Sequence, residues 1–179
     1  MKMAGSRSEE YENRIVRTVT IRRMPRTETP GMVIEESEAG REISLPLWAA
    51  RELVDASLVK LVDEGLTADE WTQTHFRERL NPTGPPAALP EGFFLRAYIS
   101  LSSSAREAAS DPARREQFNR VFARYRDILE SRIGKMIRLA SAEAPQPPRG
   151  LQPEEAQLYE EVQRIISSWR AEMRGMGER

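Results

Sequence analysis

The chain of 179 residues has no cysteine and a single histidine, His75. Without thiols it can form neither disulfides nor thiolate metal sites, and His75 has no second histidine with which to share a metal ion. The phosphate-binding patterns GxxxxGKS/T and GxGxxG and the nucleophile elbow GxSxG are also missing. We therefore expect that the protein is not an enzyme, with no catalytic residue, no metal ligand and no cofactor.

Long hydrophobic runs are missing as well. No apolar stretch approaches the roughly 20 residues that a membrane-spanning helix needs, and the start of the chain lacks the apolar core of a signal peptide. We therefore expect a cytoplasmic protein. Hydrophobic residues make up 39% of the chain and charged residues 31%. A small core under so charged a surface suits a protein that completes its burial against partners.

A small β-rich domain is predicted over residues 13–65, after a disordered polar tail at residues 1–12. Apolar and β-branched residues separated by turn signals indicate the strands, which cover residues 15–21, 32–34, 42–45 and 58–62. In the first strand Ile15, Val19 and Ile21 share one face, and the threonines between them lie on the other.

A short helix is predicted to follow the third of these strands. Pro46 suits the first helical position, where the backbone N–H has no partner inside the helix. Together with Trp48 it is expected to hold this helix in the β-rich domain. A unit of about 60 residues is marginal on its own, so we expect it to depend on a partner or on the rest of the chain.

A helical domain is predicted over residues 66–174, followed by a tail at residues 175–179. Its first helix begins after Thr67 with a capping box, in which threonine and a glutamate three residues later bind backbone donors reciprocally. Proline-rich loops and helical spacing set the elements, which cover residues 68–80, 93–109, 112–142 and 153–173. Three consecutive serines at 102–104 predict a bend or an early end in the second helix.

The third helix of this domain is the longest, about 46 Å at about 1.5 Å per residue. Its apolar residues step by four and three, and a helix this long exceeds what so small a domain needs for its own core. We expect one part of the stripe to be core and another part to be a subunit interface. The predicted anchors, which include one residue of the last helix, are Phe118, Phe122, Tyr125, Leu129, Ile133 and Trp169.

Residues 112–141 carry eight basic and three acidic side chains, although the formal net charge of the chain is only −1. Guanidinium groups can bind phosphates or carboxylates, which makes a contact with nucleic acid or with an acidic partner one hypothesis. An ordinary solvated helix surface explains the same pattern, and we favour it. The arginines concerned are Arg114, Arg115, Arg120 and Arg124.

With these elements placed, the chain resembles an archaeal GINS subunit over residues 13–173. The resemblance rests on Leu-Pro-Leu-Trp-Ala-Ala at 45–50 with the strand that follows, Glu-Ser-Arg-Ile-Gly-Lys-Met-Ile-Arg-Leu-Ala at 130–140, and Leu-Gln-Pro-Glu-Glu at 151–155 opening a helix that closes with Trp169. With the β domain first, the chain looks like the branch that corresponds to the second and third eukaryotic subunits.

The resemblance implies a non-enzymatic scaffold subunit in DNA replication, associated with the nucleoid. It implies a hetero-tetramer with an α-first GINS paralogue, and association with the MCM helicase and a Cdc45/RecJ-like protein. It transfers no catalytic residue. The alternative function is a stand-alone nucleic-acid-binding module that uses the arginine-rich helix surface.

Overall fold

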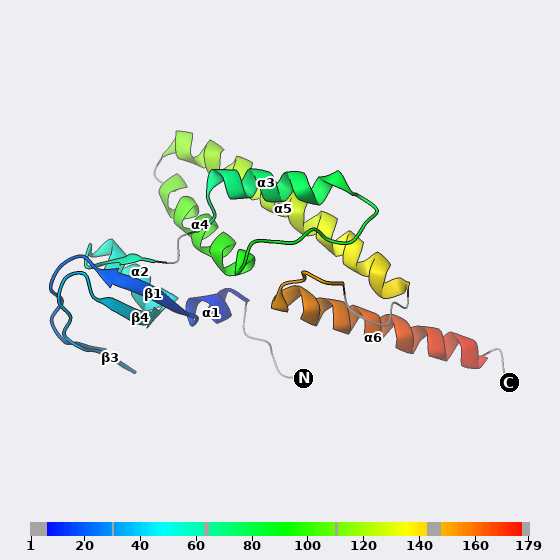
Figure 1. Ribbon diagram of the computed structural model, residues 1–179, viewed down its shortest axis with the longest axis horizontal. Helices are drawn as coiled ribbons and strands as arrows, with labels where there is room; N and C mark the ends of the chain where they lie inside the picture. Colours follow the sequence, from blue (N-terminus) through cyan, green and yellow to red (C-terminus); the bar gives the residue numbers. More distant parts are fainter. Residues whose placement is uncertain (1–6, 30, 63–64, 110, 143–147, 177–179) are drawn as a thin grey trace. The chain divides into compact units, whose positions relative to one another are not determined.

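The computed structural model describes residues 7–29, 31–62, 65–109, 111–142 and 148–176 (Figure 1). Its contacts divide the chain into two compact units, Met1–Gly65 and Leu66–Arg179. Short strands dominate the first unit, and the described part of the second is helical, with one helix of 30 residues. The predicted α+β class, with a small β-rich part before an all-α part that contains one long helix, is therefore confirmed.

In the N-terminal unit, β1 is the central strand of an antiparallel sheet with the order β4-β1-β5, and β2 and β3 form a separate hairpin. The described elements are α1 (Arg7–Glu12), β1 (Ile15–Thr20), β2 (Thr27–Thr29), β3 (Met32–Ile34), β4 (Glu42–Pro46), α2 (Leu47–Asp55) and β5 (Val59–Leu61). Buried apolar side chains from the sheet and α2 form its core and include Val16, Leu45, Leu47, Ala50 and Val59.

The inward face of β1 carries Val16 and two threonines, although Ile15 on the other face is more apolar than either threonine. Ile15 is 63% exposed, whereas Thr18 and Thr20 are buried. The Thr18 hydroxyl donates to the Ile43 carbonyl at 3.0 Å and the Thr20 hydroxyl to the Arg41 carbonyl at 3.1 Å. These bonds satisfy the buried hydroxyls, so the threonines can face the core.

The start of the described chain is helical, which differs from the disordered tail expected over residues 1–12. Helix α1 buries Tyr11, and the guanidinium of Arg14 lies 5.9 Å from the centre of its ring. The carboxylate of Glu12 pairs with Arg51 of α2. Burial of one aromatic ring and this ion pair hold the short helix in the unit; residues 1–6 lie outside the described residues.

Helix α2 begins at Leu47, one residue later than the sequence predicts, because Pro46 is extended as the last residue of β4 and is the N-cap of the helix. Its buried residues are Leu47, Ala49 and Ala50, whereas Trp48 is 40% exposed. The Leu47 N–H donates to the Arg14 carbonyl at 2.9 Å and so ties the start of α2 to the chain just before β1. Leu47 is thus the buried anchor of this helix, with Trp48 at the surface of the unit.

The C-terminal unit is built around α5, which α3, α4 and α6 all contact. Its elements are α3 (Ala68–Leu80), α4 (Phe93–Ala108), α5 (Pro112–Ser141) and α6 (Pro153–Met176). The capping box at Thr67 is present, and the Asp111 carboxylate accepts from the Ala113 N–H at 2.9 Å as the N-cap of α5. Local hydrogen bonding thus sets where α3 and α5 begin.

Helix α4 continues through the serines at 102–104 to Ala108, so the early end predicted there is wrong. The Ser102 hydroxyl donates to the Tyr98 carbonyl at 2.6 Å, one turn earlier in the same helix. A serine that bonds back to the helix backbone has no need to interrupt it. At the other end of the unit, α6 reaches Met176, beyond the predicted end at residue 173.

Two apolar clusters lie along α5. The first packs α3, α4 and the middle of α5 and contains Leu66, Trp71, Phe93, Ala97 and Ile128. The second packs the C-terminal part of α5 against the first half of α6 and contains Met136, Ala140 and Tyr159. Helix α5 is therefore the common support of the unit.

Candidate subunit interface

The six predicted interface anchors do not form one patch. Tyr125 packs against the cluster around Trp71, with the two rings edge to face at 6.0 Å. Ile133 packs against the second cluster, beside α6. Phe118 and Leu129 are half-buried, and of the six anchors Phe122 and Trp169 are exposed. The structure therefore separates residues that serve the chain's own core from residues that remain open.

An aromatic row runs along the N-terminal half of α5. Phe118 and Phe122 stack at a centroid distance of 5.7 Å and an interplanar angle of 15°, and Phe122 lies 6.5 Å from Tyr125. Phe122 is 40% exposed. Tyr125, at one end of the row, packs in the core. Its contact with Phe122 therefore helps to hold the exposed Phe122 ring in one position.

The described part of the C-terminal unit leaves several large apolar side chains of α6 exposed. Tyr159, Val162 and Ile166 pack against α5, and Arg170 donates a 2.7 Å hydrogen bond to the Ser141 carbonyl. Beside this packed face runs an exposed stripe. We call it the α6 stripe; its residues are Leu158, Ile165, Trp169, Met173 and Met176.

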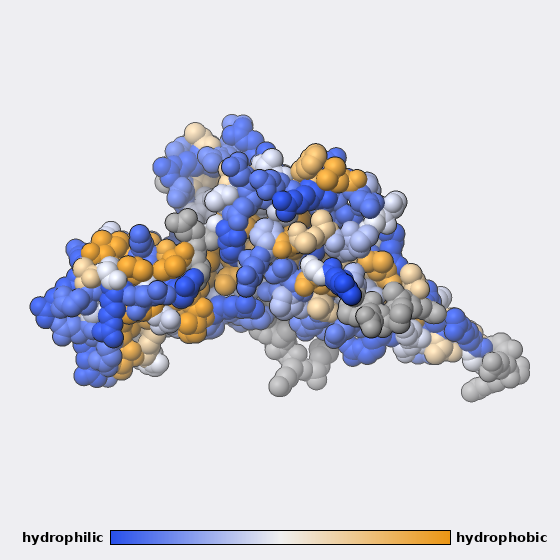
Figure 2. All heavy atoms as spheres, in the orientation of Figure 1, coloured by the Kyte–Doolittle hydropathy of each residue, from blue (hydrophilic) through white to orange (hydrophobic). Residues whose placement is uncertain are grey.

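Exposure along the α6 stripe is highest at Ile165, Trp169 and Met176, and lower at Leu158 and Met173, which are 38% and 39% exposed. Ile165 is 67% exposed and Trp169 59%, although both belong to the types most often buried or used in interfaces. Apolar atoms reach the surface in both units in the view of Figure 2. On α3, Phe76 and Leu80 are also exposed and lie one turn apart. The sequence prediction did not include this pair, although its i, i+4 spacing can be read from the sequence.

The four arginines proposed for nucleic acid or an acidic partner lie exposed on α5, and each has a contact within the chain. Arg114 pairs with Glu107 at 2.6 Å and Arg120 with Glu116 at 3.2 Å. Arg115 reaches the Ala108 carbonyl at 3.5 Å, and Arg124 donates to the Thr72 hydroxyl at 3.2 Å. Two of the four positive charges are thus matched by carboxylates of this chain.

A buried ionic cluster, which sequence reasoning missed, joins three helices of the unit. Arg132 is 1% exposed and binds the Glu155 carboxylate of α6 with both Nε and Nη2, the latter at 2.8 Å. Its Nη1 donates to Glu78 of α3 at 2.9 Å and to the Ala87 carbonyl at 2.6 Å. One guanidinium thereby links α3, the segment after it, and α6.

Lys135 completes the cluster. Its Nζ lies 2.6 Å from the Glu78 carboxylate and 2.5 Å from the Glu78 carbonyl. Two carboxylates therefore face two cations, and the cluster is neutral as a whole. The sequence contains a signal for this cluster in the helical spacing of its cations. Arg132 and Lys135 follow Ile128 by four and seven residues, so all three lie on the same, buried side of α5.

His75, the single histidine of the chain, contacts a carboxylate. His75 Nε2 lies 3.5 Å from the Asp127 carboxylate across α3 and α5. Within the described ranges, no group of three histidine, aspartate or glutamate side chains is arranged to hold a metal ion. No helix in the described part of the chain is both long and apolar enough to cross a membrane.

Residues 65–174 match the family model of the GINS complex protein helical bundle domain. The match covers more than half of the chain and takes in α3, α4, α5 and nearly all of α6. No curated protein matches the chain. GINS proteins are non-catalytic subunits of a DNA replication complex and assemble with one another. The chain, with its helical unit built around α5, belongs to the GINS family.

Proposed function

We propose that this protein is a scaffold subunit that joins an α-first GINS paralogue in a hetero-tetramer and has no catalytic role of its own. In this proposal the assembly supports the MCM replicative helicase and contacts a Cdc45/RecJ-like protein. The protein then acts in the cytoplasm at the nucleoid, where the chromosome is replicated.

The observation that carries this proposal is the α6 stripe. Helix α6 packs one face on α5 through Tyr159, Val162 and Ile166, and its neighbouring face leaves Ile165, Trp169 and Met176 exposed. Burial of such side chains is favourable by about 25 cal/mol per Å² of apolar surface, and a partner helix provides the surface that this chain does not. Continuation of the stripe beside the face already packed on α5 supports a helical partner.

The predicted anchors divide into two roles in this proposal. Phe122 and Trp169 contact the partner directly, because they are exposed. The half-buried anchors hold α5 and α6 in place and contribute their open edges; these are Phe118, Tyr125, Leu129 and Ile133. In the β-rich unit, Pro46 keeps its role at the start of the small helix, whereas the predicted anchor Trp48 is 40% exposed and Leu47 takes the buried position.

We further propose that the two compact units are the domains 13–65 and 66–174, with tails at 1–12 and 175–179. The order of the units, β-rich first and helical second, supports placement in the branch that corresponds to the second and third eukaryotic subunits.

The experiment for this function is a reconstitution with purified components. Tagged protein is incubated with MCM alone, and with MCM plus the α-first paralogue of the same genome. We expect MCM to be retained only when the paralogue is present. Retention of MCM by the lone chain, or no retention with the paralogue, would contradict the scaffold function.

The alternative, stand-alone binding of nucleic acid through α5, is less well supported. Arg114 and Arg120 are already paired with carboxylates of the chain, which lowers the positive charge offered to phosphates. The two functions differ in salt dependence: a binding module that neutralises several phosphates loses affinity steeply with salt. We expect weak DNA binding for the isolated chain at any salt concentration.

A further inference from the structure

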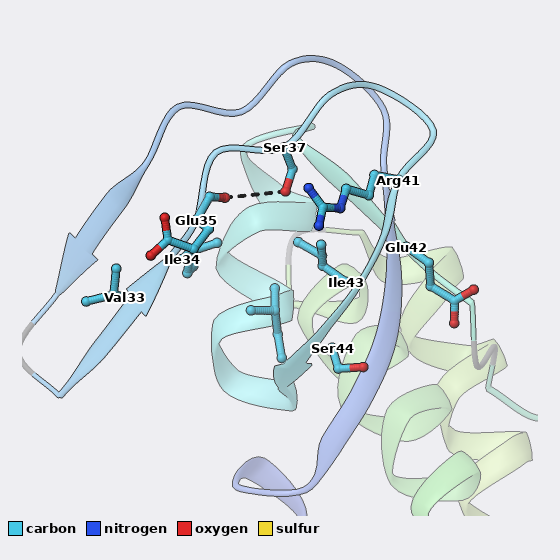
Figure 3. Close-up of a pocket in the computed structure, with 9 residues that line it drawn as sticks. Val33, Ile34, Glu35, Ser37, Arg41, Glu42, Ile43 and Ser44 are labelled. Atoms are coloured by element: carbon cyan, nitrogen blue, oxygen red, sulfur yellow. Dashed lines mark hydrogen bonds between the residues drawn. The ribbon is translucent and has the colours of Figure 1, made fainter.

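The N-terminal unit contains a groove that the proposed scaffold function does not use. It has a volume of about 260 Å³ and lies between β3 and β4, with lining side chains contributed by residues 33–45 (Figure 3). Ile34 and Leu45 are buried beside it, whereas Ile43 is half-buried and Val33 is exposed. Apolar side chains from two strands thus border a groove that remains open.

The backbone of β4 faces this groove with unused hydrogen-bonding groups. Strand β4 is at the edge of its sheet. The Thr20 N–H donates to the Arg41 carbonyl at 3.0 Å, and the Leu47 N–H donates to Arg14 at 2.9 Å. Because antiparallel pairing alternates, odd-numbered residues of β4 direct their N–H and C=O groups to β1. Glu42 and Ser44 direct theirs to the opposite side, where no strand of the described residues pairs with them.

The side chains of β4 determine which residue types would suit a strand added at this edge. Ile43 and Leu45 share the inward face with Thr18 and Val16, their partners in register, so an added strand would place apolar side chains there. Glu42 lies on the outward face, and a position beside it favours lysine or arginine.

The charge around the groove also favours a basic segment. Glu42 and Glu35 are more than half exposed, and their arginine contacts, to Arg17 at 3.6 Å and Arg26 at 3.9 Å, are long. Exposed pairs of this kind contribute little, so both carboxylates can accept a further cation. The Arg41 guanidinium reaches the Ser37 end of the groove, where it can donate to carbonyls of an incoming chain (Figure 3).

We propose that the groove between β3 and β4 binds an extended segment of a partner protein, in which apolar and basic residues alternate, by adding it as a strand to the edge of β4. Backbone hydrogen bonds to Glu42 and Ser44 would hold the segment, and Pro46, which has no N–H, would end the pairing. This site goes beyond the helical subunit interface and does not depend on it.

The test uses the full chain labelled with ¹⁵N and a synthetic probe, acetyl-Lys-Val-Lys-Val-Lys-amide. A peptide of the same composition without alternation, acetyl-Lys-Lys-Lys-Val-Val-amide, is the control. We expect the alternating peptide to shift the amide resonances of Glu42 and Ser44 and to slow their hydrogen exchange. Equal binding of both peptides, shifts confined to other residues, or no shift would overturn the proposal.

Two variants then test how the probe is held. Ser44→Pro removes an N–H that faces the groove and leaves the bonds to β1 in place, so we expect binding to weaken by about fivefold or more. Glu42→Lys should reverse the preference toward acetyl-Glu-Val-Glu-Val-Glu-amide, and Glu28→Lys, on β2, should not. If Ser44→Pro does not fold, the Glu42→Lys result still decides: an unchanged preference for the basic peptide would contradict strand addition at this edge.

Discussion

The guanidinium of Arg132 on α5 and the carboxylate of Glu155 on α6 form a two-point ion pair in which both side chains are buried. Glu155 also accepts from the Gln152 N–H at 3.0 Å, so its carboxylate is fully engaged at the start of α6. Because it joins the buried side of α5 to the first turn of α6, this pair helps to set the direction of α6 and of its exposed stripe.

Loss of the Arg132 side chain should strongly destabilise the protein. In Arg132→Met, Glu155 stays buried without its cation, and breaking a buried pair in this way costs about 3–5 kcal/mol. Urea denaturation of the full chain measures the change. Arg120→Met, at an exposed pair on the same helix, is the control and should cost under about 1 kcal/mol.

A second substitution separates the charge effect from packing. In Arg132→Met combined with Glu155→Leu no unpaired carboxylate remains at α6, and we expect much of the lost stability to return. If Arg132→Met costs no more than Arg120→Met, the buried cluster has no part in holding α6.

The Glu70–Arg96 pair should make stability depend on pH in the acid range. The hydrogen bond from Arg96, followed by that from the Thr67 backbone, lowers the pKa of Glu70 below its ordinary value of 4.5. A lowered pKa means that the folded state favours the carboxylate. Its contribution is therefore complete above pH 4.5 and is lost as the pH falls through the lowered value.

Glu70→Gln keeps a capping-box residue and removes the charge, so we expect it to cost about 1 kcal/mol at pH 7. Melting curves at pH 7 and near pH 3 should show this difference shrinking at the lower pH. Asp69→Asn, in the same helical turn but exposed, is the control. A difference between wild type and Glu70→Gln that persists unchanged in acid would contradict the assignment.

Ser57 occupies a backbone conformation that suits glycine. Its φ is +56°, and the Leu58 N–H bonds to Leu53 while the Ser57 N–H bonds to Val54, which ends α2 in a Schellman motif. Ser57→Gly should therefore stabilise the protein by about 0.5–1 kcal/mol. Ser57→Val should destabilise it, because a β-branched residue is disfavoured there; similar stabilities for the two variants would argue against strain at this turn.

Phe122→Asp should weaken assembly with the paralogue while the chain remains folded. The ring is partly exposed and loses its stacking on Phe118, a stability loss of about 1 kcal/mol. Co-purification with the paralogue and circular dichroism measure the two effects. Asn119→Asp, exposed on the same helix, should co-purify normally; unchanged co-purification of Phe122→Asp would remove the aromatic row from the interface.

The helical unit follows closely from the sequence because its signals are local. Thr67 and Asp111 mark helix starts through hydrogen bonds to residues three and two positions away, and the structure has these caps. Pro112 marks the start of α5 because its fixed φ suits the first helical position. The apolar spacing on α5 predicted one long helix. The spacing could not show which apolar residues of α5 the chain itself buries, because that depends on where α3, α4 and α6 pack.

Two features could not be predicted from the sequence because groups far away in the chain satisfy the polar side chains involved. Thr18 and Thr20 face inward because carbonyls of residues 43 and 41 accept their hydroxyls. Arg132 is buried because Glu78 and Glu155, far away in sequence, neutralise it. No local pattern contains these partners, so the buried ionic cluster and the orientation of β1 required the structure.

The most direct test of the account is light scattering after size-exclusion chromatography, on the chain co-expressed with an α-first GINS paralogue of the same genome. We predict a stable mixed oligomer for the wild type and for Ser167→Asp, which lies on the opposite side of α6 from the stripe. Ile165→Asp combined with Trp169→Asp should separate the two proteins while leaving the chain folded. A wild-type chain that elutes as a monomer apart from the paralogue, or a double variant that still assembles, would contradict the α6 stripe as the subunit interface.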